Sequence, residues 1–312
     1  MDWFSQSRLF ELARQGQRLT HILAVIPLSL IIIFFGQFGV IPVVIIMTLL
    51  YGPPLGTLWD FPSPTLSGFW AAALLISSFV LVYVFVGLWV GFFEKRPFWT
   101  LGYEQKNAFK QYLRGFLVGV VIFTAAVGGL SAFRFVGFEN SDPSQQGLAA
   151  LGGVFLILFG WIVQGGGEEV LARGWILPVI GARYRPWIGL AVSSLAFSGW
   201  HALNENLSVI AMINLALFGV FAGLYAMREG SLWGISALHS AWNWVQGNFF
   251  GFQVSGSSFG GGTLIGLIET GPDWVTGGLF GPEGGVAVTL VLIVSIGTVL
   301  FWRAKRPAGF PE

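Results

Sequence analysis

Long apolar runs alternate with short polar segments along most of the chain. Each run is long enough to cross the apolar core of a bilayer as a helix, which takes about 20 residues. The runs cover residues 20–50, 66–92, 112–133, 147–180, 186–204, 208–227, 231–248 and 285–303. The pattern predicts an all-α polytopic membrane bundle of about eight transmembrane helices. The first and fourth runs exceed the required length, so we expect them to tilt, kink or project beyond the lipid.

The same pattern divides the chain into five segments. Residues 1–18 mix apolar side chains with arginines, which predicts an amphipathic helix on the cytoplasmic membrane surface. Residues 19–134 hold transmembrane helices 1–3, and residues 147–248 hold helices 4–7, where we expect the catalytic core. Residues 249–284 form a Gly-rich extracytoplasmic loop, either a lid or re-entrant segment or a flexible connection. Residues 285–312 supply the last transmembrane helix and a basic cytoplasmic tail.

Composition supports the membrane assignment. The chain is 54% hydrophobic and only 10% charged, whereas soluble domains carry roughly a quarter charged residues. We therefore expect an integral membrane protein, placed in the cell membrane. Cysteine is absent, which excludes thiol nucleophiles, thiolate metal sites and disulfides.

The distribution of charge predicts the orientation of the bundle. With the N-terminus in the cytoplasm, the opposite side holds one basic residue, Arg134, beside several acids, including Asp60, Glu139 and Glu283. The cytoplasmic side holds Arg8, Arg14, Arg18, Lys95, Arg96, Lys106, Lys110, Arg114, Arg183, Arg185, Arg228, Arg303, Lys305 and Arg306. This bias follows the positive-inside rule and predicts that both termini are cytoplasmic.

Ionisable side chains gather in one stretch that is otherwise apolar enough to lie in lipid. Glu168, Glu169 and Arg173 fall in the fourth run, His201 in the fifth and His239 in the seventh. Charged groups are costly at that depth and mark functional sites. At a rise of about 1.5 Å per residue, Glu168, His201 and His239 lie roughly 12 to 22 Å from the cytoplasmic ends of their helices. We therefore expect three helices to bring polar groups to one site.

Helical spacing assigns different parts to the two glutamates. Glu169 and Arg173 are four residues apart, so they share a helix face and are predicted to pair. Glu168 points about 100° away and is left without a partner on its own helix, which suits a general base.

The other two helices carry further pairs at the same spacing. His239 and Asn243 are four residues apart and share a face, as do Phe197 and His201. A histidine with an amide on one interior face indicates a polar occupant such as water, a metal or a substrate carbonyl. His201 alone fits a hydrogen-bonded core histidine as well as a site residue.

Three ordered motifs carry a resemblance to a known family. The sequences EEVLAR at 168–173, FSGWH at 197–201 and HSAWN at 239–243 resemble the EExxxR, FxxxH and HxxxN motifs of the CPBP family. This is the CAAX-protease, bacteriocin-processing or Abi family of intramembrane proteases. The resemblance covers about residues 150–250, and KRPFWTLGY at 95–103 is also similar to family members.

The resemblance implies an intramembrane endopeptidase in which Glu168 activates the attacking water. It places His201, His239 and Asn243 around the site, with Glu169, Arg173 and Phe197 in support. It also implies a membrane-associated or lipidated peptide or protein as substrate, and no nucleic acid. Zinc is left open: Glu168, His201 and His239 would be its ligands, but the HExxH signature is absent.

Two other classes of function compete with proteolysis. A non-proteolytic scaffold or bacteriocin-immunity protein would share the architecture but would not need the complete set of polar groups. A proton-coupled transporter would use the buried glutamate and histidines as a relay and would require a water path through both faces.

Overall fold

The computed structural model describes residues 2–51, 67–140 and 142–301. Its α-helices are α1 (Asp2–Ser5), α2 (Arg8–Ala13), α3 (Ile22–Gly36), α4 (Val40–Tyr51), α5 (Gly68–Leu88), α6 (Ala108–Ala132), α7 (Gly147–Glu169), α8 (Leu177–Arg183), α9 (Pro186–Trp200), α10 (Val209–Glu229), α11 (Trp233–Trp244), α12 (Asp273–Thr276) and α13 (Val286–Phe301). The π-helical segments η2 (Trp89–Glu94), η5 (Val170–Ile176) and η6 (Val245–Phe250) extend α5, α7 and α11.

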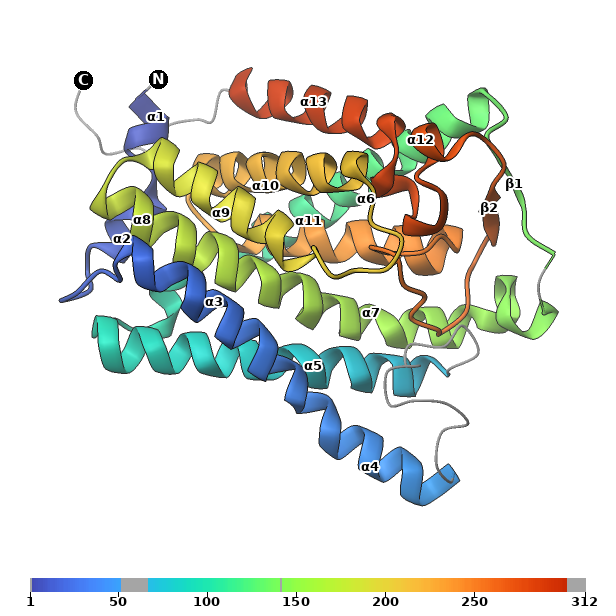
Figure 1. Cartoon of the computed structure of the whole chain (residues 1–312), viewed down its shortest axis with the longest axis horizontal. Helices are drawn as coiled ribbons and strands as arrows, with labels where there is room; N and C mark the ends of the chain where they lie inside the picture. The colour runs from blue at the N-terminus through green and yellow to red at the C-terminus, as the bar shows by residue number, and fades with distance from the viewer. Residues whose placement is uncertain (1, 52–66, 141, 302–312) are drawn as a thin grey trace.

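The remaining elements are short. The 3₁₀ turns are η1 (Gln37–Gly39), η3 (Phe98–Leu101), η4 (Pro143–Gln145), η7 (Gly278–Phe280) and η8 (Pro282–Gly284). The strands are β1 (Val136–Phe138) and β2 (Leu267–Glu269), which pair antiparallel. This small sheet joins two loop segments at one end of the molecule (Figure 1), and the rest of the bundle is helical, as predicted.

Five helical segments in the described part of the chain are long and apolar enough to cross a membrane. They are Ile22–Tyr51, Gly68–Glu94, Ala108–Ala132, Gly147–Arg183 and Val209–Glu229. A helical bundle in a membrane is therefore confirmed. The predicted number of eight is not: α9, α11 and α13 occupy the other three predicted spans, but they have 15, 12 and 16 residues. Asp60, Arg303, Lys305 and Arg306 lie outside the described residues, and the orientation of the termini stays a prediction.

The long helices lie side by side, with α11 in the interior (Figure 1). Helix α11 packs against α6, α7 and α10, and every residue from Gly234 to Asn243 is buried. The short helices α1, α2 and α8 lie at one end of the bundle, and β1, β2 and α12 lie at the other (Figure 1). Side chains on α11 thus face protein on all sides and not lipid.

Small residues let α11 and α6 approach closely. A Cβ atom on Gly115 would collide with the carbonyl of Gly234, and one on Gly119 would collide with the carbonyl of Leu238. Gly219 and Gly223 make the corresponding close contacts between α10 and α9. Both pairs have the GxxxG spacing that favours tight helix packing in membranes.

The N-terminal segment differs from the single surface helix that we expected. It forms α1 and α2, and the side chains of Leu9, Phe10 and Leu12 are buried. The Ser7 hydroxyl donates a 2.9 Å hydrogen bond to the carbonyl of Met227 at the end of α10. The apolar residues of this segment therefore pack into the bundle instead of facing lipid.

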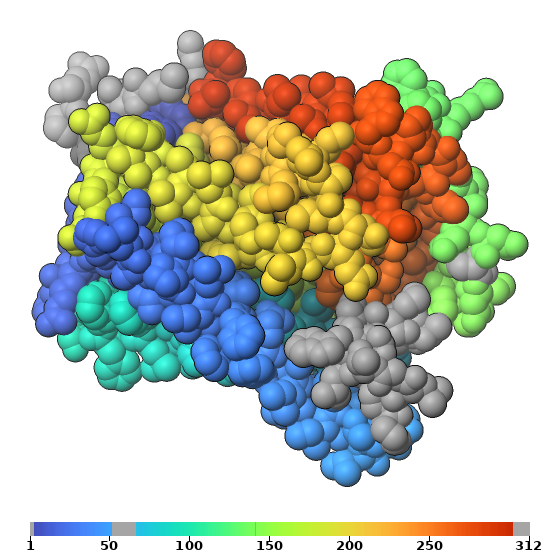
Figure 2. All heavy atoms as spheres, viewed as in Figure 1, coloured from blue at the N-terminus to red at the C-terminus, as the bar shows by residue number. Residues whose placement is uncertain are grey.

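The Gly-rich segment 249–284 is folded against the bundle. Phe252, Val254 and Phe280 are buried in it, and the amide of Asn248 donates to the carbonyls of Gly260 and Gly262. In the space-filling view this segment, orange to red, fills the same end of the molecule as β1 (Figure 2). Of the alternatives for this segment, the flexible connection does not match the structure.

Candidate functional site

The end of α7 is built so that two glutamates can be buried. Gly165, Gly166 and Gly167 precede them. A Cβ atom on Gly165 would lie 2.9 Å from the backbone nitrogen of Ser240, and one on Gly166 would collide with the Tyr83 hydroxyl. The glycines thus let α11 and α5 close on this turn, and Glu168 and Glu169 are buried as a result.

Glu169 connects two helices. Its Oε1 accepts a 2.8 Å hydrogen bond from the Arg173 guanidinium, which is the pair expected from the sequence spacing. The same oxygen lies 2.9 Å from Nδ1 of His239 on α11. Glu169 and Arg173 are wholly buried. Glu169 therefore does more than neutralise Arg173, because it also sets the orientation of the His239 ring.

Phe197 lies next to Arg173 and next to both histidines of the site. The Arg173 guanidinium carbon sits 4.5 Å from the Phe197 ring centroid, a distance at which a cation is attracted to an aromatic face. The Phe197 ring is also 5.0 Å from the His201 ring and 5.9 Å from the His239 ring. Phe197 thus supports Arg173 on one side and spaces the two histidines on the other.

Glu168 has a partner that the sequence analysis missed. Gln164, one turn earlier on α7, donates a 2.8 Å hydrogen bond from Nε2 to Glu168 Oε1. The Gln164 Oε1 in turn accepts from Asn243 Nδ2 at 2.8 Å. The expectation that Glu168 is unpaired on its helix is therefore wrong. Gln164 is an interior amide in an apolar helix, and its spacing of four from Glu168 was the available signal.

The other oxygen of Glu168 remains available for chemistry. Oε2 is buried without a hydrogen-bond partner among the described residues, and it lies 3.7 Å from His239 Nε2. That separation is too long for a direct hydrogen bond, so Oε2 keeps its capacity to accept from a water or a substrate group. Glu168 Oε2 and His239 Nε2 thus face each other at 3.7 Å.

His201 stands apart from this hydrogen-bonded network. It follows directly after the last residue of α9, and its Nδ1 lies 2.8 Å from the carbonyl of Phe197. Its side chain is half-buried, whereas His239 and Asn243 are buried. The structure therefore brings together Glu168, Glu169, Arg173, His239 and Asn243, and it places His201 next to them through Phe197.

The side-chain arrangement does not fit a zinc site. Across the described ranges, no group of three or more His, Cys, Asp or Glu side chains is placed to hold a metal ion. Glu168 and His239 approach each other, whereas the Phe197 ring contacts both histidine rings and the His201 Nδ1 is held by the Phe197 carbonyl. A catalytic zinc needs three protein ligands around an open position, so the predicted set of Glu168, His201 and His239 has no geometric support.

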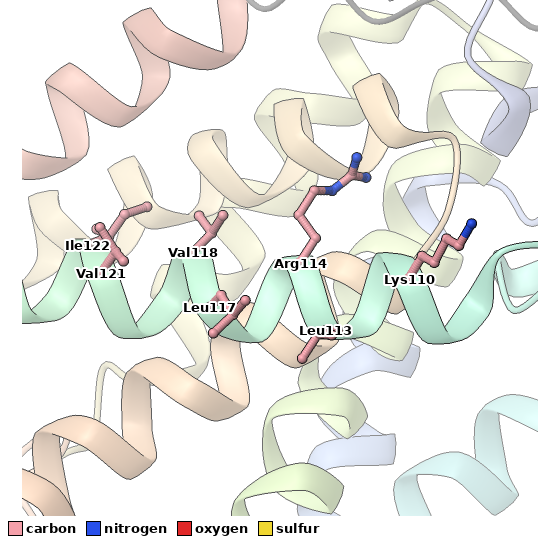
Figure 3. Close-up of a pocket in the computed structure, with 7 residues that line it drawn as sticks. All are labelled: Lys110, Leu113, Arg114, Leu117, Val118, Val121 and Ile122. Carbon is pink, nitrogen blue, oxygen red and sulfur yellow. The ribbon is translucent and has the colours of Figure 1, made fainter.

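The cavities of the bundle lie elsewhere. One of about 470 Å³ runs along α6 and is lined by apolar side chains with Lys110 and Arg114 at one end (Figure 3). A second, of about 590 Å³, continues from it between α6, α10 and α13. None of the network residues lines either cavity. These two cavities are thus separate from the buried polar groups of the site.

Comparison with known proteins finds a family to which the segment around these residues is similar. Residues 150–245 match the family model of the type II CAAX prenyl endopeptidase, Rce1-like. This segment of the chain is Rce1-like. The match confirms the resemblance to the CAAX-protease family, and the residues from Glu168 to Asn243 all fall inside it. No curated protein matches the chain. The Rce1-like segment runs from within α7 to the first residue of η6, so it contains the helices that build the site.

Proposed function

We propose that the protein is an intramembrane endopeptidase in which Glu168 activates water for attack on a peptide bond. The observation that carries this proposal is that Glu168 Oε2 is buried without a hydrogen-bond partner among the described residues and faces His239 Nε2 at 3.7 Å. The Rce1-like match supports the protease class. A scaffold would not need a buried carboxylate oxygen facing a histidine.

In the first step, Glu168 acts as general base. A water held at Oε2 gives its proton to the carboxylate as its oxygen bonds to the carbonyl carbon of the substrate. Gln164 fixes the carboxylate through Oε1, so Oε2 is the oxygen that points to the water. The product of this step is a tetrahedral intermediate with negative charge on the former carbonyl oxygen.

His239 and Asn243 would stabilise that charge. Glu169 accepts at Nδ1 of His239 and so leaves Nε2 directed toward the site. A protonated Nε2 can donate to the oxyanion, and Asn243 Nδ2 carries a second N–H beyond the one given to Gln164. Fixed donors aimed at developing charge in a water-poor site contribute about 2.7 to 4 kcal/mol each in known proteases.

The leaving group requires a proton. The tetrahedral intermediate collapses by breaking the C–N bond, and the nitrogen takes a proton as it leaves as an amine. His201, spaced from His239 by Phe197, is the residue that we assign to protonating the amine. The products are a carboxylate and a free amine. Glu168 then releases the proton that it took from the water and His201 takes one up, so both groups return to their starting states and water is the only reactant consumed besides the peptide.

The substrate would be a membrane-associated or lipidated peptide. The site is surrounded by helices long enough to cross a bilayer, and the matched family is described as a prenyl endopeptidase. A substrate anchored in lipid by a prenyl or acyl chain would reach such a site by diffusion in the membrane.

The test uses the full-length protein in liposomes. A quenched fluorescent peptide is supplied with and without a prenylated cysteine near its C-terminus, to wild type and to Glu168→Ala. The proposal predicts cleavage by wild type, faster for the lipidated peptide, and loss of cleavage in the variant. Wild type that cleaves neither peptide, in a preparation shown to be folded, would favour the scaffold alternative.

A further inference from the structure

Glu283 is a buried carboxylate that lies outside the three motifs and outside the Rce1-like segment. It belongs to η8, at the point where the Gly-rich segment returns to α13. Only 9% of its surface is exposed, and burying a carboxylate is costly unless specific partners compensate. Its surroundings connect it to the site by two separate routes.

The first route runs through hydrogen bonds to His201. Glu283 Oε1 accepts a 2.5 Å hydrogen bond from the Ser255 hydroxyl. The Ser255 carbonyl accepts a 2.9 Å hydrogen bond from the Asn204 side-chain amide. The Asn204 backbone N–H donates to the carbonyl of His201 at 3.0 Å. Glu283, Ser255 and Asn204 thus form a relay that ends at the backbone carbonyl of His201.

The second route runs along α10. The Asn214 side-chain amide donates to the backbone carbonyls of Glu283 and Gly285, at 2.8 and 2.9 Å. Asn214 lies one helical turn before Phe218, whose ring is 4.9 Å from the His239 ring. The backbone of Glu283 is therefore held to α10, the helix whose Phe218 contacts His239. Burial raises the pKa of Glu283, and positive charge on His201 or His239 lowers it, so the three groups interact.

The backbone at Ser255 adds an independent observation. Its φ is +51°, in the left-handed region that favours glycine, although the position is a serine. A non-glycine residue costs about 1 kcal/mol or more there, and such strain marks positions with a function. Glycine would remove the strain but would also remove the hydroxyl that Glu283 accepts from. Ser255 thus keeps its hydroxyl at the expense of a strained backbone.

We propose that Glu283 is a positioning residue for His201, which it holds through Ser255 and Asn204. The Gly-rich segment thereby completes the site from outside the family motifs. The charged or titratable neighbours of the two histidines are then Glu168 and Glu169 from α7, Arg173 from η5 and Glu283 from η8. The catalytic role of His201 rests on the proposed proteolysis. The hydrogen bonds that join Glu283 to His201 do not depend on it.

The test compares four variants of the full-length protein in liposomes. Glu283→Ala and Ser255→Gly break the relay, and Ser255→Gly does so while relieving backbone strain. Glu283→Gln keeps an oxygen that accepts from Ser255. Glu205→Ala is the matched control, because Glu205 is an exposed acid in the α9–α10 connection, which also contains His201 and Asn204. Each variant is measured for kcat and KM and for the NMR signals of its imidazole side chains, of which the chain has three.

We expect Glu283→Ala and Ser255→Gly to lower kcat by up to about a hundredfold and to leave KM unchanged. A hundredfold loss is the cost of displacing a reacting group by about 1 Å. Both should shift the His201 imidazole signal and leave that of His21 in place. Glu283→Gln should restore kcat and signal, and Glu205→Ala should match wild type. An unmoved His201 signal in folded Ser255→Gly overturns the proposal. Because the NMR result needs no substrate, inactive wild type would overturn the proposed function without deciding the relay.

Discussion

Glu169 and His239 are 70 residues apart in the sequence, yet the Oε1 of Glu169 lies 2.9 Å from the Nδ1 of the His239 imidazole. The same oxygen accepts from Arg173. Arg173 therefore fixes Glu169, Glu169 orients His239, and His239 faces the free oxygen of Glu168. This arrangement gives the second glutamate of the EExxxR motif a role in positioning the site as well as in balancing charge.

The stability of the bundle should depend strongly on Glu169. Glu169→Leu leaves the Arg173 guanidinium buried without its counterion, which costs about 3–5 kcal/mol. Thermal unfolding in detergent measures the effect. The double variant Glu169→Leu/Arg173→Leu is the control, and it should be more stable than the single variant because no buried charge is left unpaired. A single variant as stable as wild type would show that the pair does not contribute to folding.

Gln164 should matter for catalysis although it lies outside the family motifs. Gln164→Leu leaves Glu168 Oε1 and Asn243 Nδ2 without the amide that joins them. We expect kcat to fall by about tenfold or more, a loss of at least about 1.4 kcal/mol, which is within the cost of a buried group left unsatisfied. Combining the change with Asn243→Leu should add less than the sum of the two effects, because both residues belong to one network. Fully additive effects on kcat would mean that Gln164 does not act through Asn243.

How much of this site follows from sequence depends on the kind of contact. The Glu169–Arg173 pair was predictable because both residues lie on one helix at a spacing of four. The contacts of Glu169 with His239 and of Gln164 with Asn243 join α7 to α11, and they depend on the rotation of one helix against the other. Nothing in the periodicity of either helix specifies that rotation.

The loop contributions could be predicted even less. Glu283 reaches the site only because 249–284 folds back on the bundle, and a Gly-rich composition indicates freedom of the backbone without indicating its path. The N-terminal segment shows the same limit. Its mix of apolar and basic residues is compatible with burial against protein or against lipid, and the structure has Leu9, Phe10 and Leu12 against protein.

Elemental analysis tests the geometric argument about zinc. The positions of Glu168, His201 and His239 predict substoichiometric zinc in the purified, active protein and activity that survives a chelator. Wild type with about one zinc per chain, losing metal and cleavage together on chelation, would contradict this. His201→Ala would then be expected to lower the zinc content.

The small sheet should loosen as pH rises. Burial, together with the nearby Asp273, raises the pKa of Glu269 to about 8, although Thr276 opposes the shift. The folded state therefore binds more protons than the unfolded state between about pH 4.5 and 8, so this contribution to stability is lost as pH rises through that window. Hydrogen exchange of the β1 and β2 amides measures the loss after correction for intrinsic rates.

The control for this pH dependence is another acid in the same region. Glu269→Gln should make the protection of β1 and β2 independent of pH across the window. Glu139→Gln, which changes an exposed acid just after β1, should retain the dependence seen in wild type. Protection that rises with pH in wild type would show that Glu269 is ionised in the folded protein well below pH 8.

Replacing Glu168 by glutamine tests the central claim most directly. Glu168→Gln keeps the size of the side chain and an oxygen for Gln164 but removes the base. The measurement is kcat for a lipidated peptide in liposomes, with KM and the unfolding temperature determined on the same preparation. We predict that kcat falls by about 10²–10⁴-fold, the contribution of a general base, while KM and the unfolding temperature stay close to those of wild type. Cleavage at the wild-type rate would contradict the assignment of Glu168 as the residue that activates water.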